Sequence, residues 1–200
     1  MRNGKKVEDQ MKWFTSDWHL GHDNVVKFSN RPFNDINEMN EKIILNTLSV
    51  LRPGDELYFL GDLAWRRYDL NTFFDKWPKN VNFHWIIGNH DRSWEPFKKR
   101  CASIDNAKKI HIGENTVILN HYPMFTWDKS HYNSWLLFGH HHRNSHGTEI
   151  VQEFMLKGKM LNVNLEFNNY MPYPEEEITK IMMSRPDNWD LINRAGSSVG

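Results

Sequence analysis

Short clusters of aspartate, asparagine and histidine recur along this 200-residue chain, each directly after a short apolar run. These side chains offer carboxylate, amide and imidazole ligand atoms and no thiolate, a set that suits manganese, iron or zinc. The clusters are, in chain order, Asp17 with His19, Asp62, Asn89 with His90 and Asp91, His121, and His140 with His142. The residue types and their order therefore point first to metal chemistry.

The spacing within the clusters indicates which side chains share a face. Asp17 and His19 are two residues apart, as are His140 and His142, so in an extended chain each pair projects to one side. His141 should point the other way, and we assign it no metal. Glycine, which permits a sharp turn, immediately precedes three of the clusters, at Gly61, Gly88 and Gly139.

Seven potential ligands are too many for one ordinary zinc ion, which takes four. Two ions that share Asp62 as a bridge would have four protein ligands each. Such a pair, about 3.5–4 Å apart, can clamp both oxygens of an in-line displacement at phosphorus and lowers the pKa of bound water. Taken singly, each residue would more often cap a turn, form a salt bridge or be an ordinary hydrogen-bonded histidine, but five clusters at strand ends favour metal. We predict two ions of manganese, iron, zinc or nickel, with the ligands Asp17, His19, Asp62, Asn89, His121, His140 and His142.

The apolar runs before the clusters predict β-strands at residues 12–15, 56–60, 82–87, 116–119 and 135–138. Helical periodicity occurs at residues 35–51 and 69–77, and Pro174 followed by three glutamates predicts another helix that ends near Arg185. Strands that alternate with helices early and follow one another later indicate an α/β layered fold. Ligands of such folds bind at the carboxyl ends of the strands, where the polar clusters fall.

Taken together, these motifs resemble those of the calcineurin-like metallophosphoesterase superfamily. The resemblance spans about residues 11 to 183 and includes a late segment, residues 161–166, that looks like the closing strand of the family. Residues 16–24 and 31–33 look like the small bacterial and phage members. The motifs are D-x-H at Asp17 to His19, G-D at Gly61 and Asp62, G-N-H-D at Gly88 to Asp91, a strand that ends in His121, and G-H-x-H at Gly139 to His142.

The resemblance implies a four-layer sandwich of two mixed β-sheets flanked by helices, with the metals at one edge. It makes His90 a catalytic residue beside the scissile phosphate, in keeping with the ability of imidazole to give a proton near neutral pH. Asp91 then either orients His90 or is a structural carboxylate. The ligands implied are Asp17, His19, Asp62 and His142 for the first ion, and Asp62, Asn89, His121 and His140 for the second.

One departure from the superfamily bears on the substrate. Its serine/threonine phosphatases carry an aspartate three positions and an arginine four positions after the aspartate of the second motif, where this chain has Trp65 and Arg66. The missing aspartate weakens a protein-phosphatase interpretation and favours phosphodiesters or nucleotides. Arg66 either contacts a phosphate oxygen as a catalytic residue or is a solvated arginine, and Arg67 competes for the role.

Other residues near the clusters are weaker candidates. His22 either lines a substrate pocket or starts a helix, and Arg31 is a similar but weaker substrate-binding candidate. Most aromatic residues belong to apolar runs and should be core. Four others lie near ligands in the sequence, and one or two of them could form a pocket wall: Trp65, Tyr122, Phe125 and Trp127.

Composition limits the partners. Lysine plus arginine equals aspartate plus glutamate at 25 each, whereas proteins that grip long nucleic acids usually carry a basic excess. A small phosphoester, such as a nucleotide, needs no such excess. Cys101 is the only cysteine, which excludes an internal disulfide and a cysteine-based zinc site.

No apolar run approaches the roughly 18 residues of a membrane span, and residues 1–10 lack the apolar stretch of a secretory signal. We therefore expect a cytoplasmic protein with no membrane partner. The expected organisation is a polar extension at residues 1–10, one phosphoesterase domain at 11–185 and a tail at 186–200.

The chemistry leaves several substrates open. The leading hypothesis is hydrolysis of a phosphodiester, of small or cyclic nucleotide type, by a hydroxide that bridges the metals. The alternatives are a phosphomonoesterase or a nuclease of the same chemistry, and a non-catalytic metal-binding scaffold. Scaffold members of the superfamily typically lack a ligand or the catalytic histidine, whereas this chain has all seven ligands and His90.

Overall fold

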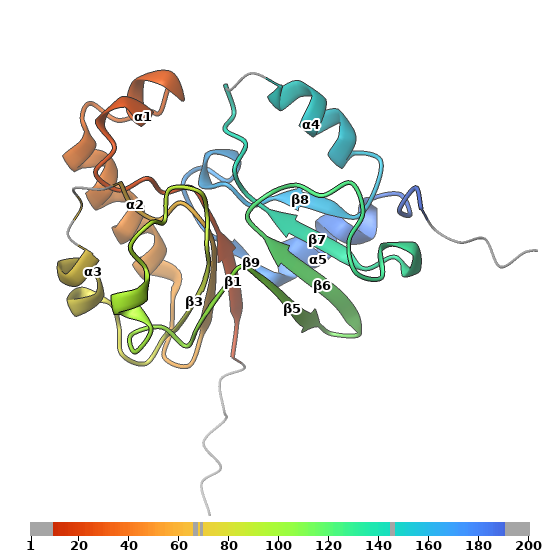
Figure 1. The fold of residues 1–200 in the computed structure, drawn as a ribbon, viewed down its shortest axis with the longest axis horizontal. Helices are drawn as coiled ribbons and strands as arrows, with labels where there is room; N and C mark the ends of the chain where they lie inside the picture. Colours follow the sequence, from red (N-terminus) through yellow and green to blue (C-terminus); the bar gives the residue numbers. More distant parts are fainter. Residues whose placement is uncertain (1–9, 66–67, 69, 145–146, 191–200) are drawn as a thin grey trace, which may run out of the picture.

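Two mixed β-sheets pack face to face between helices in this computed structural model, which describes residues 10–65, 68, 70–144 and 147–190. Helices α2 (Ile36–Val50) and α3 (Leu70–Lys76) cover the first sheet, and α4 (Thr148–Met155) covers the second (Figure 1). The four-layer α/β sandwich is confirmed. The predicted extension and most of the predicted tail, residues 1–9 and 191–200, lie outside the described residues.

The first sheet contains β1 (Lys12–Thr15), β2 (Glu56–Leu60), β3 (Asn82–Ile86), β4 (Ser103–Asp105) and β9 (Tyr173–Pro174). Its order is β4-β3-β2-β1-β9, with β9 antiparallel to β1 and the other pairs parallel. Because parallel strands end at the same edge, β1, β2 and β3 present the residues that follow them to a common space.

The second sheet contains β5 (Ala107–Ile112), β6 (Asn115–Asn120), β7 (Trp135–Phe138) and β8 (Met160–Asn162), in that order. β5 and β6 form an antiparallel hairpin, and β6, β7 and β8 are parallel. A bridge between Ser16 and Asn164 joins the segments that follow β1 and β8. The ends of the two sheets are therefore tied together beside the clusters.

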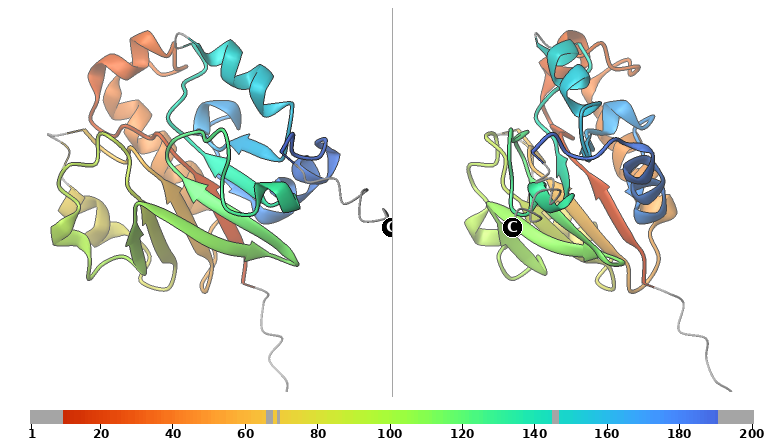
Figure 2. Two further views of the ribbon diagram at one scale, coloured as in Figure 1. Left: turned by 45° about the vertical axis from the view of Figure 1, so that its right-hand side comes forward. Right: turned by 90° about the vertical axis from the view of Figure 1, so that its right-hand side faces the viewer.

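Two further helices are α1 (Asp23–Phe28) and α5 (Glu175–Ser184). Figures 1 and 2 show α1 and α4 on the side of the molecule toward which β1 runs. Asn144 Nδ2 donates to the carbonyl oxygen of Ser29 at 3.1 Å, which links the segments beside these two helices. Within the described part of the chain, no helix has both the length and the apolar character to span a membrane.

Strand side chains alternate between two cores. In β2, Tyr58 and Leu60 face the second sheet, whereas Leu57 and Phe59 face the helices. β7 alternates in the same way between the first sheet and the layer of α4. A strand that is buried on both faces is apolar throughout, which explains the uninterrupted apolar runs of the sequence.

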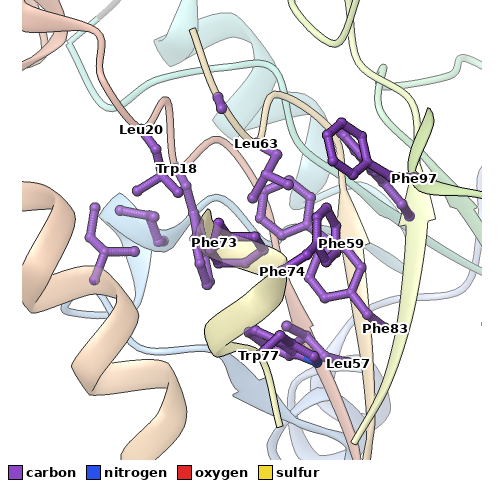
Figure 3. Packing of buried hydrophobic residues seen from close by; sticks show 14 of the residues in the cluster. Trp18, Leu20, Leu57, Phe59, Leu63, Phe73, Phe74, Trp77, Phe83 and Phe97 are labelled. Atoms are coloured by element: carbon purple, nitrogen blue, oxygen red, sulfur yellow. The ribbon is translucent and has the colours of Figure 1, made fainter. Parts of the chain in front are cut away.

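The core beneath α3 is rich in aromatic rings. Figure 3 shows Phe73, Phe74 and Trp77, from α3 and the residue after it, packed beside Phe59 and Phe83 of the first sheet. The Phe83 ring lies edge-on to Trp77 and Phe74, with centroids 5.0 and 5.5 Å apart. This packing fixes α3 against the sheet.

The predicted strands and helices are confirmed to within one or two residues at their ends, with one exception. Residues 161–166 were predicted to form a strand, but β8 ends at Asn162 and a 3-10 turn follows at Leu165–Phe167, capped by the Asn164 side chain. This turn directs Glu166 into the interior, where it is 2% exposed. The sequence pattern did not predict α4, β4, β5 or β9, and for α1 it offered only a helix start at His22 as one of two alternatives.

The ordered domain also continues beyond the predicted boundary at residue 185. Asn188 is 2% exposed, and its Nδ2 donates to the carbonyl oxygens of Ser130 and Ser134 at 2.9 Å each. The Trp189 ring packs against Phe125 and other aromatic rings beside α4. The residues just after α5 therefore belong to the packed domain.

Candidate metal centre

The polar clusters come together at the carboxyl ends of the strands, where the two sheets meet. Asp17, Asp62 and Asn89 lie in the loops directly after β1, β2 and β3. His121 directly follows β6, and His140 lies two residues after β7. Segments far apart in the sequence thus contribute to one site.

The backbone of this site is turned in an uncommon way. Asp17, His19, Asp62 and His140 have φ angles of 59°, 53°, 62° and 71°, in the left-handed region that few non-glycine residues occupy. Hydrogen bonds between loops hold these turns: the N–H groups of Asp17 and His19 donate to the carbonyl oxygens of Gly61 and Asp62 at 2.9 and 3.0 Å. Strained turns that gather at one edge are typical of functional sites.

The glycines before the clusters provide space for the ligands. Only Gly61 of the three has a positive φ, at 91°, so the expected sharp turn applies to that position alone. A Cβ atom at any of them would collide with a side chain of the site: His121 at Gly61, Asp62 at Gly88, and Ser16 and Asp17 at Gly139. A larger residue at these positions would displace the side chains that meet there.

Asp17, His19 and His142 form one group whose potential donor atoms all lie within 4.8 Å of one another. His19 Nε2 is 3.9 Å from Asp17 Oδ1 and 3.2 Å from His142 Nε2. The N–H of His140 donates to both Asp17 carboxylate oxygens, at 3.1 and 3.0 Å. The loop after β7 is thereby fixed to the loop after β1.

Asp62, His121 and His140 form a second group of the same kind, which Asn89 joins. Asn89 Oδ1 is 3.1 Å from both His121 Nε2 and His140 Nδ1. Asp62 Oδ2 is 3.5 Å from His121 Nε2 and 3.7 Å from His19 Nε2 of the first group. One carboxylate oxygen therefore faces both groups, while the other accepts a backbone N–H at 2.9 Å.

Comparison with known proteins identifies the family. The family model described as calcineurin-like phosphoesterase matches residues 13–194. The chain belongs to the calcineurin-like phosphoesterase family. It is similar to the uncharacterized protein MJ1445 of Methanocaldococcus jannaschii, with 30% identity over 174 residues, 85% of this chain and 90% of that protein. It is also similar to the crystal structure of AQ665 from Aquifex aeolicus, a protein of unknown function, with 28% identity and a TM-score of 0.70 over 86% of this chain and 100% of that one.

The calcineurin-like phosphoesterases depend on metal ions, and the donor atoms of this site fit such ions. His142 Nδ1 lies 2.7 Å from Glu166 Oε1, and since a carboxylate only accepts, Nδ1 carries the proton and Nε2 turns its lone pair toward His19. His121 Nδ1 likewise donates to the carbonyl oxygen of Leu60 at 2.8 Å. Buried lone pairs and carboxylate oxygens that converge call for a cation among them, and the outer hydrogen bonds fix each ring toward it.

The electrostatics of the two groups are alike. Burial lowers the pKa of His19 well below its ordinary value, and burial together with the neighbouring His121 lowers the pKa of His140 to about 4. Burial also opposes a charge on His121 and His142, yet the nearby carboxylates outweigh it, namely Asp62 and Asp17 for His121, and Glu166 and Asp17 for His142. The pKa of His121 thereby rises to about 9, and that of His142 also rises. Both rises show that the carboxylates of the two groups favour positive charge beside them, which a bound cation would supply.

Arg31 supports the ligand loops from beneath. Its side chain is 0% exposed, and it donates Nε to Glu166 Oε1 at 2.8 Å and Nη2 to the carbonyl oxygen of Asp17 at 2.7 Å. Burial opposes the charge of Glu166, but the hydrogen bond from His142 and the charge of Arg31 lower its pKa to about 2. Arg31 therefore does not face a substrate, contrary to the expectation from sequence. Its buried partner Glu166 is a site residue that the sequence reasoning missed.

His90 and Asp91 have different surroundings. The His90 side chain is 33% exposed, and its Nε2 is 3.9 Å from Asp62 Oδ2. The buried Asp91 carboxylate accepts three backbone N–H groups from the loops after β2 and β3, at 2.8–2.9 Å, and Trp85 Nε1 at 3.1 Å. Burial, followed by the charge of Asp62, raises the pKa of Asp91 to about 6. This geometry matches the structural alternative for Asp91, which joins two ligand loops.

The weaker candidates are resolved in part. His22 caps the N-terminus of α1, and its Nδ1 accepts from the N–H of Val25 at 3.0 Å, which is the helix-start alternative. Its ring also contacts Trp65, with centroids 4.1 Å apart. Arg66 and Arg67 lie outside the described residues.

Exposed aromatic rings border the site on two sides. The Phe28 ring lies 5.9 Å from that of His142, and the Tyr122 ring lies 4.8 Å from that of His140. Phe28 is 54% exposed and Tyr122 is 45% exposed. The sequence reasoning missed Phe28, because its place at the end of a short helix carried no signal. Two other aromatic residues expected near the site pack instead in the layer of α4: Phe125 and Trp127.

Proposed function

We propose that this calcineurin-like phosphoesterase hydrolyses a phosphodiester with the help of two metal ions. The observation that carries the proposal is the position of Asp62 Oδ2 between two ligand groups, 3.7 Å from His19 Nε2 and 3.5 Å from His121 Nε2. This position suits a carboxylate that bridges two ions. The first ion would take Asp17, His19, Asp62 and His142, and the second Asp62, Asn89, His121 and His140.

When bound, the two ions would supply an activated water molecule and positive charge for the phosphate oxygens. The protein holds its ligands rigidly for that purpose. Glu166 keeps His142 in one tautomer, and the Leu60 carbonyl does the same for His121. The backbone N–H of His90 fixes the carboxylate of Asp62, so that only Oδ2 remains for the ions.

His90 is positioned to give a proton to the leaving oxygen. Its Nε2 lies 3.9 Å from Asp62 Oδ2, next to both ligand groups, and a third of the side chain is exposed to an incoming substrate. A histidine side chain at this position can reach both the ligand groups and an incoming ester, as a general acid must.

The substrate that we propose is a small diester such as a short or cyclic nucleotide. Trp65 stands where the serine/threonine phosphatases of the superfamily carry an aspartate, which argues against a phosphoprotein. The chain has no net charge, so two metal ions would supply the attraction for one phosphate group but not for a long nucleic acid. Manganese is the ion to test first, because carboxylate, amide and imidazole ligands accommodate it.

The proposal is tested by hydrolysis of bis-p-nitrophenyl phosphate and p-nitrophenyl phosphate with Mn²⁺. We expect faster turnover of the diester, loss of activity with EDTA, and its recovery when Mn²⁺ is restored. His90→Ala should lower kcat by about 10²–10⁴-fold while Mn²⁺ still binds, because a general acid contributes that much. Asp62→Asn should weaken metal binding itself.

Each other outcome changes the proposal in a defined way. Preference for the monoester would make the protein a phosphomonoesterase. Bound metal with no turnover of either ester would indicate a scaffold. Full activity of His90→Ala would remove the proposed proton donor.

A further inference from the structure

A cavity of about 440 Å³ adjoins His90. Its volume is within the range of about 300–1,000 Å³ that small-molecule sites occupy. The ring of His90 forms part of its wall, and none of the seven proposed metal ligands is among the described residues that line it. The cavity is therefore separate from the ligand groups and shares with them only the neighbourhood of His90 and Asp91.

The position of His90 indicates which part of a substrate the cavity could hold. His90 Nε2 lies 3.9 Å from Asp62 Oδ2, while its ring also lines the cavity, so the imidazole stands between the two spaces. In the proposed hydrolysis, a hydroxide ion forms the new P–O bond, the P–O bond to the leaving group breaks, and the leaving oxygen takes the proton that His90 gives up. The group attached to that oxygen must extend past His90, and the cavity is the space that lies there.

We infer that the cavity binds a nucleoside as the leaving group of the diester, an inference that rests on the proposed function. Trp65 and Tyr68, both half-buried, line it, and aromatic side chains are the surfaces on which nucleobases stack. The centroid of the Trp65 ring lies 5.0 Å from that of His90. A base stacked on Trp65 would therefore lie next to the leaving oxygen that His90 protonates.

The polar lining agrees with a neutral, flat ligand. Asn71 and Ser93 bring an amide and a hydroxyl to the cavity, groups that can bond to the edge of a base. The Asp91 carboxylate is 7% exposed and already accepts four N–H groups, so it does not call for a cationic ligand. Arg92 is the one cationic side chain among the described residues that line the cavity.

The test uses adenosine as the probe and ribose as its matched control. In a ¹⁵N spectrum of the indole N–H groups, adenosine should shift the signals of Trp65 and Trp85, which line the cavity, and leave that of Trp135 in place. Ribose should shift neither. Trp65→Phe assigns the Trp65 signal, because it removes that N–H and keeps a ring.

Trp65→Ala should weaken adenosine binding by roughly tenfold, read from the Trp85 signal, because stacking on one aromatic ring contributes at that level. Phe125→Ala removes an exposed ring elsewhere, 68% exposed, and should leave the affinity unchanged. Equal effects of ribose and adenosine, or an unchanged affinity of Trp65→Ala, would overturn the inference.

Two outcomes separate the inference from the proposed function. If the protein hydrolyses the aryl diester but adenosine leaves the Trp65 and Trp85 signals in place, the nucleoside site is wrong and the diesterase stands. If adenosine shifts both signals but neither aryl ester is hydrolysed, the nucleoside site stands without a leaving-group role and the proposed function fails.

Discussion

The two ligand groups depend on buried residues that would never touch a substrate. Glu166 is 2% exposed and accepts from Arg31, from His142 and from the N–H of Arg143, the last at 2.9 Å. A buried ion pair is stable only when its remaining lone pairs are satisfied, and here they are. In the proposed two-metal centre, the chain Arg31–Glu166–His142 would therefore determine how firmly the first group holds its ion.

Replacing Glu166 tests this dependence. Glu166→Gln should weaken Mn²⁺ binding at the first group by about 10–100-fold, because a neutral amide accepts the His142 Nδ1 proton more weakly and leaves the charge of Arg31 unpaired. Isothermal titration with Mn²⁺ measures the change, and Glu149→Gln on the exposed face of α4 is the control. An unchanged affinity in folded Glu166→Gln protein would show that this carboxylate does not position His142.

The single thiol offers a test of burial through pH. Burial raises the pKa of Cys101 from its ordinary 9.0 to about 12, so the folded state keeps the thiol neutral. At pH 8 the folded protein should contain about a thousandfold less thiolate than protein unfolded in urea. A more basic thiolate is also a better nucleophile, which offsets part of this difference. Iodoacetamide should therefore label the folded protein roughly 30-fold more slowly. The native rate should still rise steeply above pH 9, where labelling of the unfolded chain levels off.

The free energy of unfolding should also depend on pH, in the direction that the raised pKa of Cys101 sets. A group with a raised pKa favours the folded state while it is neutral, so Cys101 should destabilise the fold as the pH rises above 9. Cys101→Ser would remove that dependence. Equal labelling of folded and unfolded protein at pH 8 would contradict the raised pKa of this half-buried thiol.

The site could be predicted in part at this scale. The convergence of Asp17, Asp62 and His121 was predictable because each follows an apolar run that ends at one sheet edge. The role of Glu166 was not predictable. An acidic residue after an apolar segment is usually a surface carboxylate, and the sequence does not show which partner buries it. Arg31 was misread for the same reason, since its partner lies 135 residues away.

At the scale of elements, strand prediction succeeded because strands buried on both faces are continuous apolar runs bounded by polar clusters. The shorter or more polar elements carried no such signal. β5 is largely lysine, histidine and isoleucine in alternation, with one face exposed, and α1 has six residues. The segment after β8 was predicted wrongly because the side chain of Asn164, which caps the turn, competes with strand pairing.

The aromatic core beneath α3 should contribute strongly to stability. Phe83 is 1% exposed and touches rings from both α3 and β2, so Phe83→Ala should lower the free energy of unfolding by about 3–5 kcal/mol. Urea denaturation followed by fluorescence measures it. Leu45→Ala on α2, at a residue 53% exposed, should change the free energy by less than about 0.5 kcal/mol. Similar values for the two variants would contradict the core described here.

At the scale of the whole molecule, the two sheets act as one support for one site. The first sheet brings Asp17, Asp62 and Asn89, the second brings His121 and His140, and neither sheet alone holds a complete ligand group. The division of the site between two sheets is that of the calcineurin-like phosphoesterase fold. Because both sheets contribute to each group, the packing between the sheets sets the distances between these side chains. The chain has no net charge, so in the proposed function the metal ions would be the main attraction for a phosphate.

The most direct test of the central claim is a crystal structure of the protein grown with Mn²⁺, examined by anomalous scattering at the manganese edge. Two peaks about 3.5–4 Å apart on either side of Asp62 Oδ2, one beside His19 and one beside His121, are the predicted result. A single peak, or two peaks that do not share Asp62, would contradict the two-metal centre on which the proposed hydrolysis depends.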